Sequence, residues 1–365
     1  MRVKLEDVCE RGTSSLMQKD ITNESGPYPV YGASGRIGGL SSYQQERKTV
    51  AVVKDGAGIG RTMLLPEKSS IIGTMQYLIP KSSVKPEYLY YVVRYMHLEK
   101  YFSGATIPHI YYRDYKSEEF NLHDKEEQDK IVDILRKAEH VIACRQQQLS
   151  ALDELVKARF VEMFGDAKLN PYAFPCSTLS EYIEFLTSGS RGWSQYFTGN
   201  GEYFITIKNV KNCKITLQDV QHVTPPDNAE AKRTKVQEND LLISITADLG
   251  RTGVVTKEIA EHGAYINQHL TCIRLNQEKL NPVYVAYYME SDAGKEQFKS
   301  KNQSAVKAGL NFNAINTLKL IAPPLSLQNE FAAFVQQVDK SRVEVQKALD
   351  QTQLLFDSLM QQYFG

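Results

Sequence analysis

The sequence predicts an α+β fold in which two mixed α/β domains follow one another, each ending in a long helix. Three observations predict it. A stretch of roughly forty residues without internal proline or glycine occurs twice, at 124–165 and 324–365. The two copies are 200 residues apart without a gap, and shorter matches relate the segments that precede them. A repeat of this kind indicates one unit duplicated in tandem.

The segment 124–165 is predicted to be a helix because its apolar residues recur at alternating steps of four and three, the spacing of a coiled-coil seam. Asp124 followed by Glu127 is a capping-box pattern at its start. At about 1.5 Å per residue the helix is roughly 60 Å long. Its predicted core positions are Ile131, Leu135, Ile142, Leu149, Leu152 and Val156.

The segment 324–365 repeats this pattern, with Gln328 matching Gln128 and both copies ending in Phe-Gly. Ser326, which follows two prolines, is a weaker cap candidate. The predicted core positions are Phe331, Val335, Val345, Leu349, Phe356 and Leu359. Arginines interrupt the two seams, and they either snorkel to water or mark contacts with partner subunits; they are Arg145, Arg159 and Arg342.

The segments 1–123 and 166–323 are predicted to be the two globular domains. Short β-rich runs such as 49–53 and 241–245 lie beside glycine-rich turns, which indicates mixed α/β structure. The second domain has to connect the end of the first helix to the start of the second. A compact domain does this most simply if the helices are antiparallel, so we expect an antiparallel coiled-coil pair with pseudo-two-fold symmetry.

Composition excludes several classes of protein. No run of eighteen apolar residues is present, and the N-terminal residues lack the apolar core of a signal peptide, so the expected location is cytoplasmic. The five cysteines are scattered, which argues against disulfides and zinc ribbons. With 43 basic and 43 acidic residues the net charge is zero, so any nucleic-acid binding has to rest on local clusters.

No motif predicts catalysis or a metal site. The stretch 56–62, GAGIGRT, lacks the glycine and lysine spacing of a phosphate-binding loop, and a tight turn presenting Arg61 and Thr62 is the better interpretation. Asn281-Pro282-Val283-Tyr284 is similar to the catalytic loop of amino-methyltransferases, but it matches the repeat as a proline at a helix start. The histidines are not spaced with carboxylates as metal ligands are. We therefore expect a non-catalytic chain.

Polar turns carrying basic and aromatic residues remain as candidates for nucleic-acid binding, because such side chains contact base edges and phosphates. Each of them alone could equally be a solvated surface group or a satisfied core group, and Trp193 could equally be core. In the first domain they are Tyr31, Arg36, Lys54, Arg61, Thr62, His109, Tyr111 and Arg113. In the second they are Arg191, Trp193, Lys208, Asn209, Arg251, Thr252, Gln268, His269 and Lys307.

The whole chain resembles the specificity (S) subunits of Type I restriction-modification systems. The helix-opening signature of that family, Pro-Leu followed shortly by Gln, matches the start of the second helix at 323–328. The first helix start, 122–128, keeps Glu-Gln but lacks the proline. The stretches 28–32, YPVYG, and 265–269, YINQH, are similar to recurrent motifs of the family's target recognition domains.

The resemblance implies a DNA-binding subunit of a restriction system. Each target recognition domain would read one half of a split double-stranded DNA target, and the helices would set the spacer and dock two modification (methyltransferase) subunits. Those partners would bring S-adenosylmethionine for DNA modification, and restriction subunits with ATPase and nuclease activity would join them. This chain would hold no cofactor itself. The alternative is a coiled-coil scaffold that recruits partners without reading DNA sequence.

Overall fold

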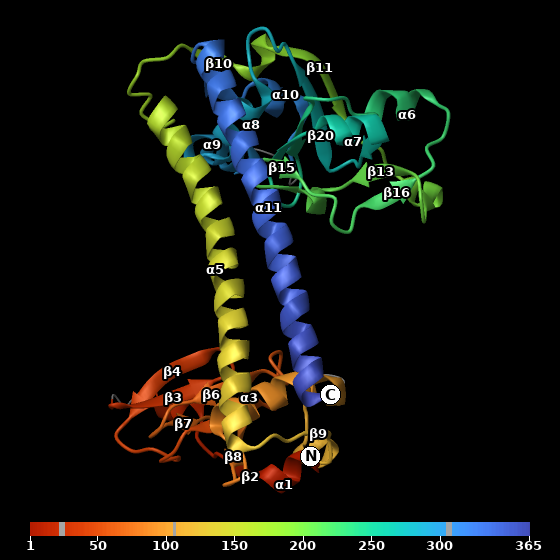
Figure 1. Ribbon diagram of the computed structural model, residues 1–365. Helices are drawn as coiled ribbons and strands as arrows, with labels where there is room; N and C mark the ends of the chain where they lie inside the picture. Colours follow the sequence, from red (N-terminus) through yellow and green to blue (C-terminus); the bar gives the residue numbers. More distant parts are fainter. Residues whose placement is uncertain (22–25, 105–106, 304–308) are drawn as a thin grey trace. The chain divides into compact units, whose positions relative to one another are not determined.

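The computed structural model describes residues 1–21, 26–104, 107–303 and 309–365, which form two compact units. Unit 1 contains Met1–Gln148 and Val345–Gly365, and unit 2 contains Leu149–Glu344. The two long helices are α5, Lys125–Phe164, and α11, Leu325–Phe364 (Figure 1). Each helix therefore contributes one part to each unit.

The globular part of unit 1 contains a four-stranded antiparallel sheet, in the order β2-β8-β5-β6, and a three-stranded sheet, β4-β3-β7, whose β3 and β7 are parallel. Strands β1 and β9 pair separately. The strands are β1 Arg2–Lys4, β2 Cys9–Thr13, β3 Tyr28–Gly32, β4 Gly35–Leu40, β5 Thr49–Val53, β6 Thr62–Leu65, β7 Ser70–Ile71, β8 Met75–Pro80 and β9 Glu119–Asn121. The helices are α1 Leu5–Val8, α2 Gln18–Ile21, α3 Pro86–Tyr95, η1 Leu98–Tyr101 and α4 Tyr112–Tyr115.

Unit 2 repeats this topology with sheets β11-β20-β17-β18 and β12-β16-β13-β19, and β13 is again parallel to its neighbour β19. Two short pairs, β10 with β21 and β14 with β15, complete the strands. The strands are β10 Cys176–Thr178, β11 Ile183–Ser188, β12 Phe197–Thr198, β13 Glu202–Ile205, β14 Val210–Lys211, β15 Lys214–Ile215, β16 Gln221–Val223, β17 Leu241–Ser244, β18 Thr252–Val254, β19 Ala264–Ile266, β20 Leu270–Leu275 and β21 Lys319–Ile321. The helices are η2 Leu179–Glu181, η3 Trp193–Tyr196, η4 Ile207–Asn209, α6 Ala229–Thr234, α7 Lys257–His262, α8 Pro282–Glu290, α9 Asp292–Gln303 and α10 Phe312–Asn316.

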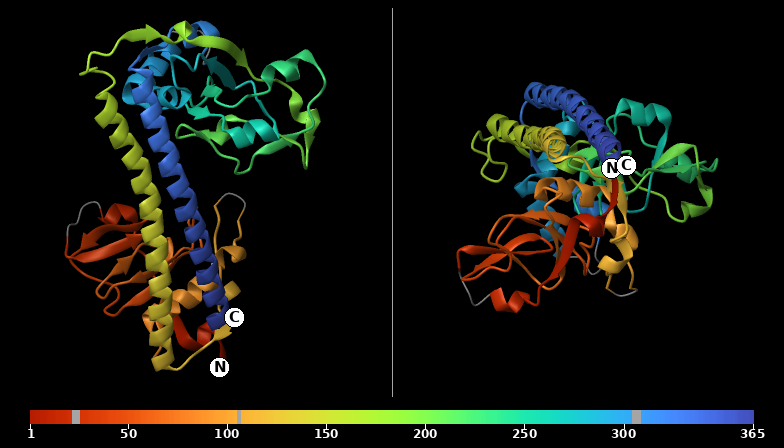
Figure 2. Two further views of the ribbon diagram at one scale, coloured as in Figure 1. Left: turned by 45° about the horizontal axis from the view of Figure 1, so that its top comes forward. Right: turned by 60° about the horizontal axis from the view of Figure 1, so that its bottom comes forward.

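The long helices pack against each other in opposite directions (Figures 1 and 2). In unit 1 the start of α5, with Ile131, shares a buried core with the end of α11, with Phe356. In unit 2 the end of α5 meets the start of α11, where the rings of Phe160 and Phe331 have centroids 5.4 Å apart. The predicted antiparallel pair is therefore confirmed.

The predicted core positions of the helix pair differ in burial. Buried positions are Ile131, Leu135, Val156, Phe331, Val335 and Phe356. Half-buried positions are Ile142, Leu149, Leu152, Val345, Leu349 and Leu359. Phe164 and Phe364 are also fully buried, although they lie outside the predicted seams. Their rings pack on α8 and α3, at 4.7 Å from Tyr284 and 5.2 Å from Tyr88, so burial at the helix ends comes from the globular parts.

A fully buried glutamine joins the start of α5 to the start of α3 in unit 1. The Gln128 amide oxygen accepts from the backbone N–H of Lys85, the residue before α3, at 2.9 Å. Its amide nitrogen donates to the carbonyls of Ser83 and His123 at 3.0 and 2.9 Å. One side chain thus satisfies backbone groups of both helix starts, which would otherwise be buried without partners.

Gln328 makes the equivalent link in unit 2 and is also fully buried. Its amide oxygen accepts from the backbone N–H of Asn281, before α8, at 2.8 Å, and its nitrogen donates to the carbonyl of Pro323 at 2.7 Å. The glutamine that marks the repeat in the sequence therefore attaches each globular part to its helix.

The two long helices begin differently. In α5 the backbone N–H of Glu127 donates to the Asp124 carboxylate at 2.9 Å, which confirms Asp124 as a cap. Ser326 is not the cap of α11, because it lies inside the first turn of that helix. The Pro324 carbonyl instead accepts from the backbone N–H of Leu327 at 2.9 Å. Proline fits this position since its fixed φ is compatible with a helix start.

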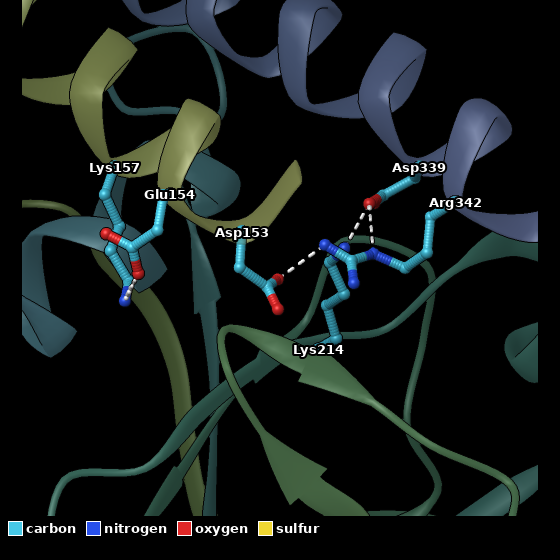
Figure 3. A network of polar contacts seen from close by, with 6 residues as sticks. All are labelled: Asp153, Glu154, Lys157, Lys214, Asp339 and Arg342. Carbon is cyan, nitrogen blue, oxygen red and sulfur yellow. Dashed lines mark hydrogen bonds and ion pairs between the residues drawn. The ribbon is translucent and has the colours of Figure 1, made fainter. Parts of the chain in front are cut away.

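The arginines of the seams bond to neighbouring residues within their own units. In unit 2, Arg342 on α11 pairs with Asp153 on α5 at 2.5 Å (Figure 3). Lys214, from the β14–β15 hairpin, pairs with Asp339 on α11 beside it. The network thus links the hairpin, α11 and α5.

The other two arginines are also engaged. Arg159 pairs with Glu330 across the helices at 2.9 Å, and Arg145 donates to Gln148 at 2.9 Å. The partner of Arg159 is a carboxylate and that of Arg145 is a neutral amide, and among the described residues the Arg159 Nε is buried without a hydrogen-bond partner.

Candidate nucleic-acid interface

The loop after β5 closes into a tight turn, as the sequence predicts. The backbone N–H of Val53 donates to the Arg61 carbonyl at 2.9 Å, and that of Gly60 donates back to the Val53 carbonyl at 2.9 Å. Gly60 has φ of +80°, which favours glycine, and a Cβ there would lie 2.7 Å from the backbone nitrogen of Glu99. The turn leaves the Arg61 side chain exposed.

The loop after β17 closes in the same way in unit 2. The backbone N–H of Ser244 donates to the Arg251 carbonyl at 2.9 Å, and that of Gly250 donates to the Ser244 carbonyl at 3.0 Å. Gly250 has φ of +79°, and a Cβ there would lie 2.2 Å from the ring of Phe298. Both domains therefore present an equivalent loop from the end of an equivalent central strand.

The loop of unit 1 brings two of the predicted residues together around a carboxylate. Asp55 contacts the Lys54 ammonium at 2.5 Å and the His109 Nδ1 at 2.7 Å. The backbone fixes the same arrangement, because the Gly56 N–H donates to Pro108 and the Ile110 N–H donates to Lys54, both at 2.9 Å. Lys54 and His109, 55 residues apart in sequence, thus share one partner.

The Asp55 carboxylate is ionised at neutral pH. Partial burial by itself would raise its pKa, but hydrogen bonds from Lys54 and His109 outweigh this and hold the pKa below its ordinary value. The stabilisation that comes with this lowered pKa is present above the ordinary carboxyl pKa of about 4 and is lost as pH falls through the lowered value. An ionised carboxylate only accepts hydrogen bonds, so His109 donates its Nδ1–H to Asp55.

Tyr111 and Arg113 extend this cluster across the surface. The His109 ring stacks on Tyr111 with an interplanar angle of 24° and centroids 6.3 Å apart. The Arg113 guanidinium lies over the Tyr111 ring, 4.8 Å from its centroid. Tyr111 and Arg113 are both exposed. The structure therefore joins Lys54, His109, Tyr111 and Arg113 into one continuous row.

Of the remaining predicted residues of unit 1, three lie at or against the hairpin of β3 and β4, and Thr62 opens β6. The Arg61 guanidinium donates to the carbonyl of Ala33 in the hairpin turn at 2.6 Å. Tyr31 and Arg36 face each other in the β3–β4 register; Tyr31 is half-buried and Arg36 is exposed. Thr62 is half-buried and donates to the Gly60 carbonyl at 3.2 Å.

In unit 2 an imidazole occupies a comparable position, held by a hydroxyl group. His269 Nδ1 lies 2.7 Å from the hydroxyl of Thr246, which follows β17 as Asp55 follows β5. The Gln268 amide nitrogen lies 3.2 Å from His269 Nε2. Because an amide N–H is a donor only, this contact requires Nε2 to accept, and His269 then carries its proton on Nδ1.

The basic residues predicted in unit 2 are partly dispersed. Arg251 pairs with Asp248 in the same loop at 2.5 Å and is half-exposed. Arg191 and Lys208 are exposed in separate turns. Lys307 lies outside the described residues.

Three predicted residues of unit 2 are interior and do not face solvent. Trp193 is 3% exposed and packs on Phe204, with ring centroids 5.7 Å apart. Asn209 is 2% exposed, and its amide is occupied by backbone and side-chain groups of its own loop. Thr252 is fully buried and donates to the Ala286 carbonyl at 3.0 Å. Each satisfies a structural requirement inside the domain and is therefore not exposed to a ligand in this structure.

Sequence reasoning overlooked Asp55 and Thr246, the side chains that hold the two histidines. A signal was present, because both residues directly precede the loops that lead to the repeated Gly-Arg-Thr. The contacts themselves join residues 54 and 23 positions apart. A single sequence does not show which distant histidine meets each loop.

Two classes of site are not found in the part of the chain that the structure describes. No group of three or more His, Cys, Asp or Glu side chains there could hold a metal ion. Within the same residues, no helix combines the length and apolar character that a membrane crossing requires.

The sequence matches known specificity subunits. A family model for the Type I restriction modification DNA specificity domain matches residues 1–154 and 181–352. The putative type I restriction enzyme MjaX specificity subunit of Methanocaldococcus jannaschii is 21% identical over 295 residues, covering 73% of this chain and 66% of that protein. The type I restriction enzyme EcoBI specificity subunit of Escherichia coli is 20% identical over 169 residues, covering 45% and 35%. The matches thus span just under two thirds and about one third of these relatives.

Solved structures share the fold. The S subunit of a Type I restriction-modification system from M. genitalium superposes with a TM-score of 0.62 at 15% identity, covering 100% of this chain and 96% of that one. A chain from a study of complex assembly and conformational transition in the type I R-M system gives 0.56 at 17% identity, covering 100% and 97%. Specificity subunits are non-catalytic components of these complexes. Since the family model covers most of the sequence, this chain belongs to the Type I restriction-modification DNA specificity family.

Proposed function

We propose that this chain reads a bipartite double-stranded DNA target, with one half-site for each recognition domain. The observation that carries the proposal is the repeated loop after the central strand. Its backbone is closed by the same hydrogen bonds in both domains, whereas its polar side chains differ. A constant backbone that presents variable donors and acceptors suits two readers of different sequences.

The first reader is the row Lys54, His109, Tyr111 and Arg113, together with Arg61 and Arg36 nearby. Lysine and arginine side chains suit phosphates and guanine, and an aromatic ring suits apolar contact with bases. The second reader is the pair Gln268 and His269 with Arg251, and amide groups suit adenine. Because the two sets differ in charge and in amide content, the half-sites are expected to differ in sequence.

The long helices are proposed to dock two modification subunits, which carry S-adenosylmethionine. In unit 1, Ile134 and Val141 lie seven residues apart on α5, and each is 40% exposed. In unit 2, Val343 on α11 is 63% exposed. A helix already packed on one face and apolar on another suits a second helix from a partner. Restriction subunits are expected to join the assembled complex.

Domain exchange tests the two-reader proposal. Residues 1–123 are replaced by the recognition domain of another family member, and the complex is expressed with its partner subunits. Methylation mapping of the host genome is expected to show one altered half-site, the other half-site unchanged and the spacer preserved. The matched control replaces 166–323 and is expected to alter the other half-site.

Two results would contradict the proposal. If both half-sites change after one exchange, the domains do not read independently. If neither changes while the complex still assembles and methylates, the chain is a scaffold that recruits partners without reading DNA.

A further inference from the structure

The most informative feature of the first reading surface is an acidic residue. Asp55 is ionised and its side chain is 25% exposed, within a row of basic and aromatic groups. A carboxylate that faces DNA repels the phosphates, and this weakens binding unless the charge has another use. Asp55 has such a use, because both of its oxygens are engaged with candidate DNA contacts, Lys54 and His109.

We propose that Asp55 is a positioning residue for half-site recognition, which holds the His109 imidazole in one orientation against the first half-site without contacting DNA itself. The proposal rests on the function proposed above. By accepting the Nδ1–H of His109, Asp55 leaves Nε2 as the ring nitrogen that is available to a DNA group. Tyr111 stacks on the same ring and limits its tilt.

The second domain repeats the Nδ1 contact, although Gln268 also occupies the Nε2 of its histidine. At the position after its central strand, Thr246 takes the place of Asp55 and contacts His269 Nδ1 at 2.7 Å. The two histidines come from different parts of their domains, since His109 precedes α4 and His269 lies between β19 and β20. The same loop position therefore holds an imidazole by its Nδ1 in both domains, with different chemistry and a different histidine.

The charge at Asp55 makes the proposal testable in a way that few positioning residues allow. If Asp55 acts only as a negative charge, Asp55→Asn removes repulsion and tightens binding to every duplex. If Asp55 positions His109, the same change weakens binding to the cognate first half-site selectively. Electrostatics and positioning thus predict opposite changes for the cognate duplex.

The experiment uses the full chain assembled with its modification subunits and duplexes based on the target from methylation mapping. Fluorescence anisotropy gives the Kd for the cognate duplex and for duplexes altered in the first or the second half-site. Asp55→Asn is expected to lower discrimination at the first half-site about tenfold, the scale of one lost base contact. Discrimination at the second half-site is expected to stay unchanged, and Asp55→Glu is expected to restore part of the loss.

Two further variants separate positioning from other roles. Asp114→Asn removes a negative charge that lies 3.5 Å from Arg113 on the same surface. It is expected to tighten binding slightly to all duplexes without changing discrimination. In a His109→Ala background, Asp55→Asn is expected to cause no further loss, because the group it orients is absent.

Chemically modified duplexes show whether His109 contacts a base or a phosphate. If His109 contacts a base, an analogue that lacks the contacted group is expected to abolish the effect of Asp55→Asn at one position: a purine without its amino group where Nε2 accepts, or a 7-deaza purine where Nε2 donates to N7. If it contacts a phosphate, the effect is expected to respond to a neutral methylphosphonate at one backbone position. Either result supports the positioning role.

The proposal fails if Asp55→Asn leaves first-half discrimination unchanged or behaves as Asp114→Asn does. That failure is distinct from failure of the two-reader function, because the latter appears in the wild-type complex as an absence of discrimination at the first half-site.

Discussion

The two units attach their globular parts to the helices in the same way but stabilise the junctions with different charges. Gln128 and Gln328 make equivalent contacts with the starts of α3 and α8. The hydroxyls of Tyr88 and Tyr284, on these short helices, both donate to the carbonyl of the strand that leads to the long helix, at 2.8 and 2.9 Å. Both halves of the repeat share these side-chain contacts with the backbone, so the geometry of attachment is the feature they have in common.

The charges at the junction have diverged around one acidic position. In unit 1, Glu139 on α5 forms an ion pair with Arg94 on α3. The Tyr91 hydroxyl also donates to the Glu139 carboxylate, at 2.5 Å. In unit 2 the equivalent residue, Asp339 on α11, forms an ion pair with Lys214 of the β14–β15 hairpin. The acidic group was kept while its cation moved to another element. An ion pair can be rebuilt from a new direction more easily than a buried backbone contact.

The largest effect is expected for the shared glutamines. Gln128→Leu leaves one buried N–H and two carbonyls without their partner and is expected to lower the free energy of unfolding of unit 1 by about 3 kcal/mol. Gln328→Leu is expected to cost unit 2 about 2 kcal/mol for the same reason. Urea denaturation followed by hydrogen exchange assigns the loss to α3 or α8. The control Gln147→Leu, at an exposed position of α5, is expected to have little effect, and equal results for all three variants would refute the shared role.

A smaller effect is expected at the diverged junctions. Arg94→Met removes the pair with Glu139 and the stacking of the guanidinium on Phe356, 5.4 Å from the ring centroid. It is expected to cost about 2 kcal/mol. Lys214→Met removes a pair of similar exposure but no contact of the cation with an aromatic ring among the described residues, and it is expected to cost less than about 1 kcal/mol, falling further in 1 M salt. Thermal unfolding at low and high salt measures both changes. A larger loss from Lys214→Met would reverse this ranking of the junctions.

The smallest effect is expected when the seam of unit 2 is converted to that of unit 1. The repeat places Ile142 and Gln353 where unit 2 has Arg342 and Asp153. Arg342→Ile alone leaves Asp153 without its cation and is expected to cost about 1 kcal/mol. Adding Asp153→Gln is expected to restore stability to within about 0.5 kcal/mol. Urea titrations of both variants measure the coupling, and a double variant weaker than the single one would show that the network has a further role.

Much of the fold follows from the sequence because the repeat is long and the helices are strongly periodic. The antiparallel direction of α5 and α11 follows from chain order alone. The cap at Asp124 follows from local backbone chemistry, and the Gly-Arg-Thr turn follows from its glycine. The prediction of Ser326 as the cap of α11 is wrong, because the helix begins one residue earlier and the Pro324 carbonyl accepts its first hydrogen bond without a polar side chain. In each correct case the determining interactions lie within a few residues or recur with a fixed period.

The candidate site is less accessible to sequence reasoning. Three residues of the second domain have polar or aromatic side chains suited to DNA, yet all three are buried inside the domain: Trp193, Asn209 and Thr252. Whether such a residue faces solvent depends on which distant strand covers it, and local composition does not encode that choice.

The sequence by itself determined that this protein is a tandem repeat of a mixed domain and a long helix. It also identified the family that this arrangement resembles. Only the tertiary structure decided that Lys54 and His109 meet at Asp55, while His269 meets Thr246 in the other domain. The physical reason is range: helix periodicity and turn chemistry are local, whereas a contact between side chains on separate loops exists only once the sheets have positioned those loops.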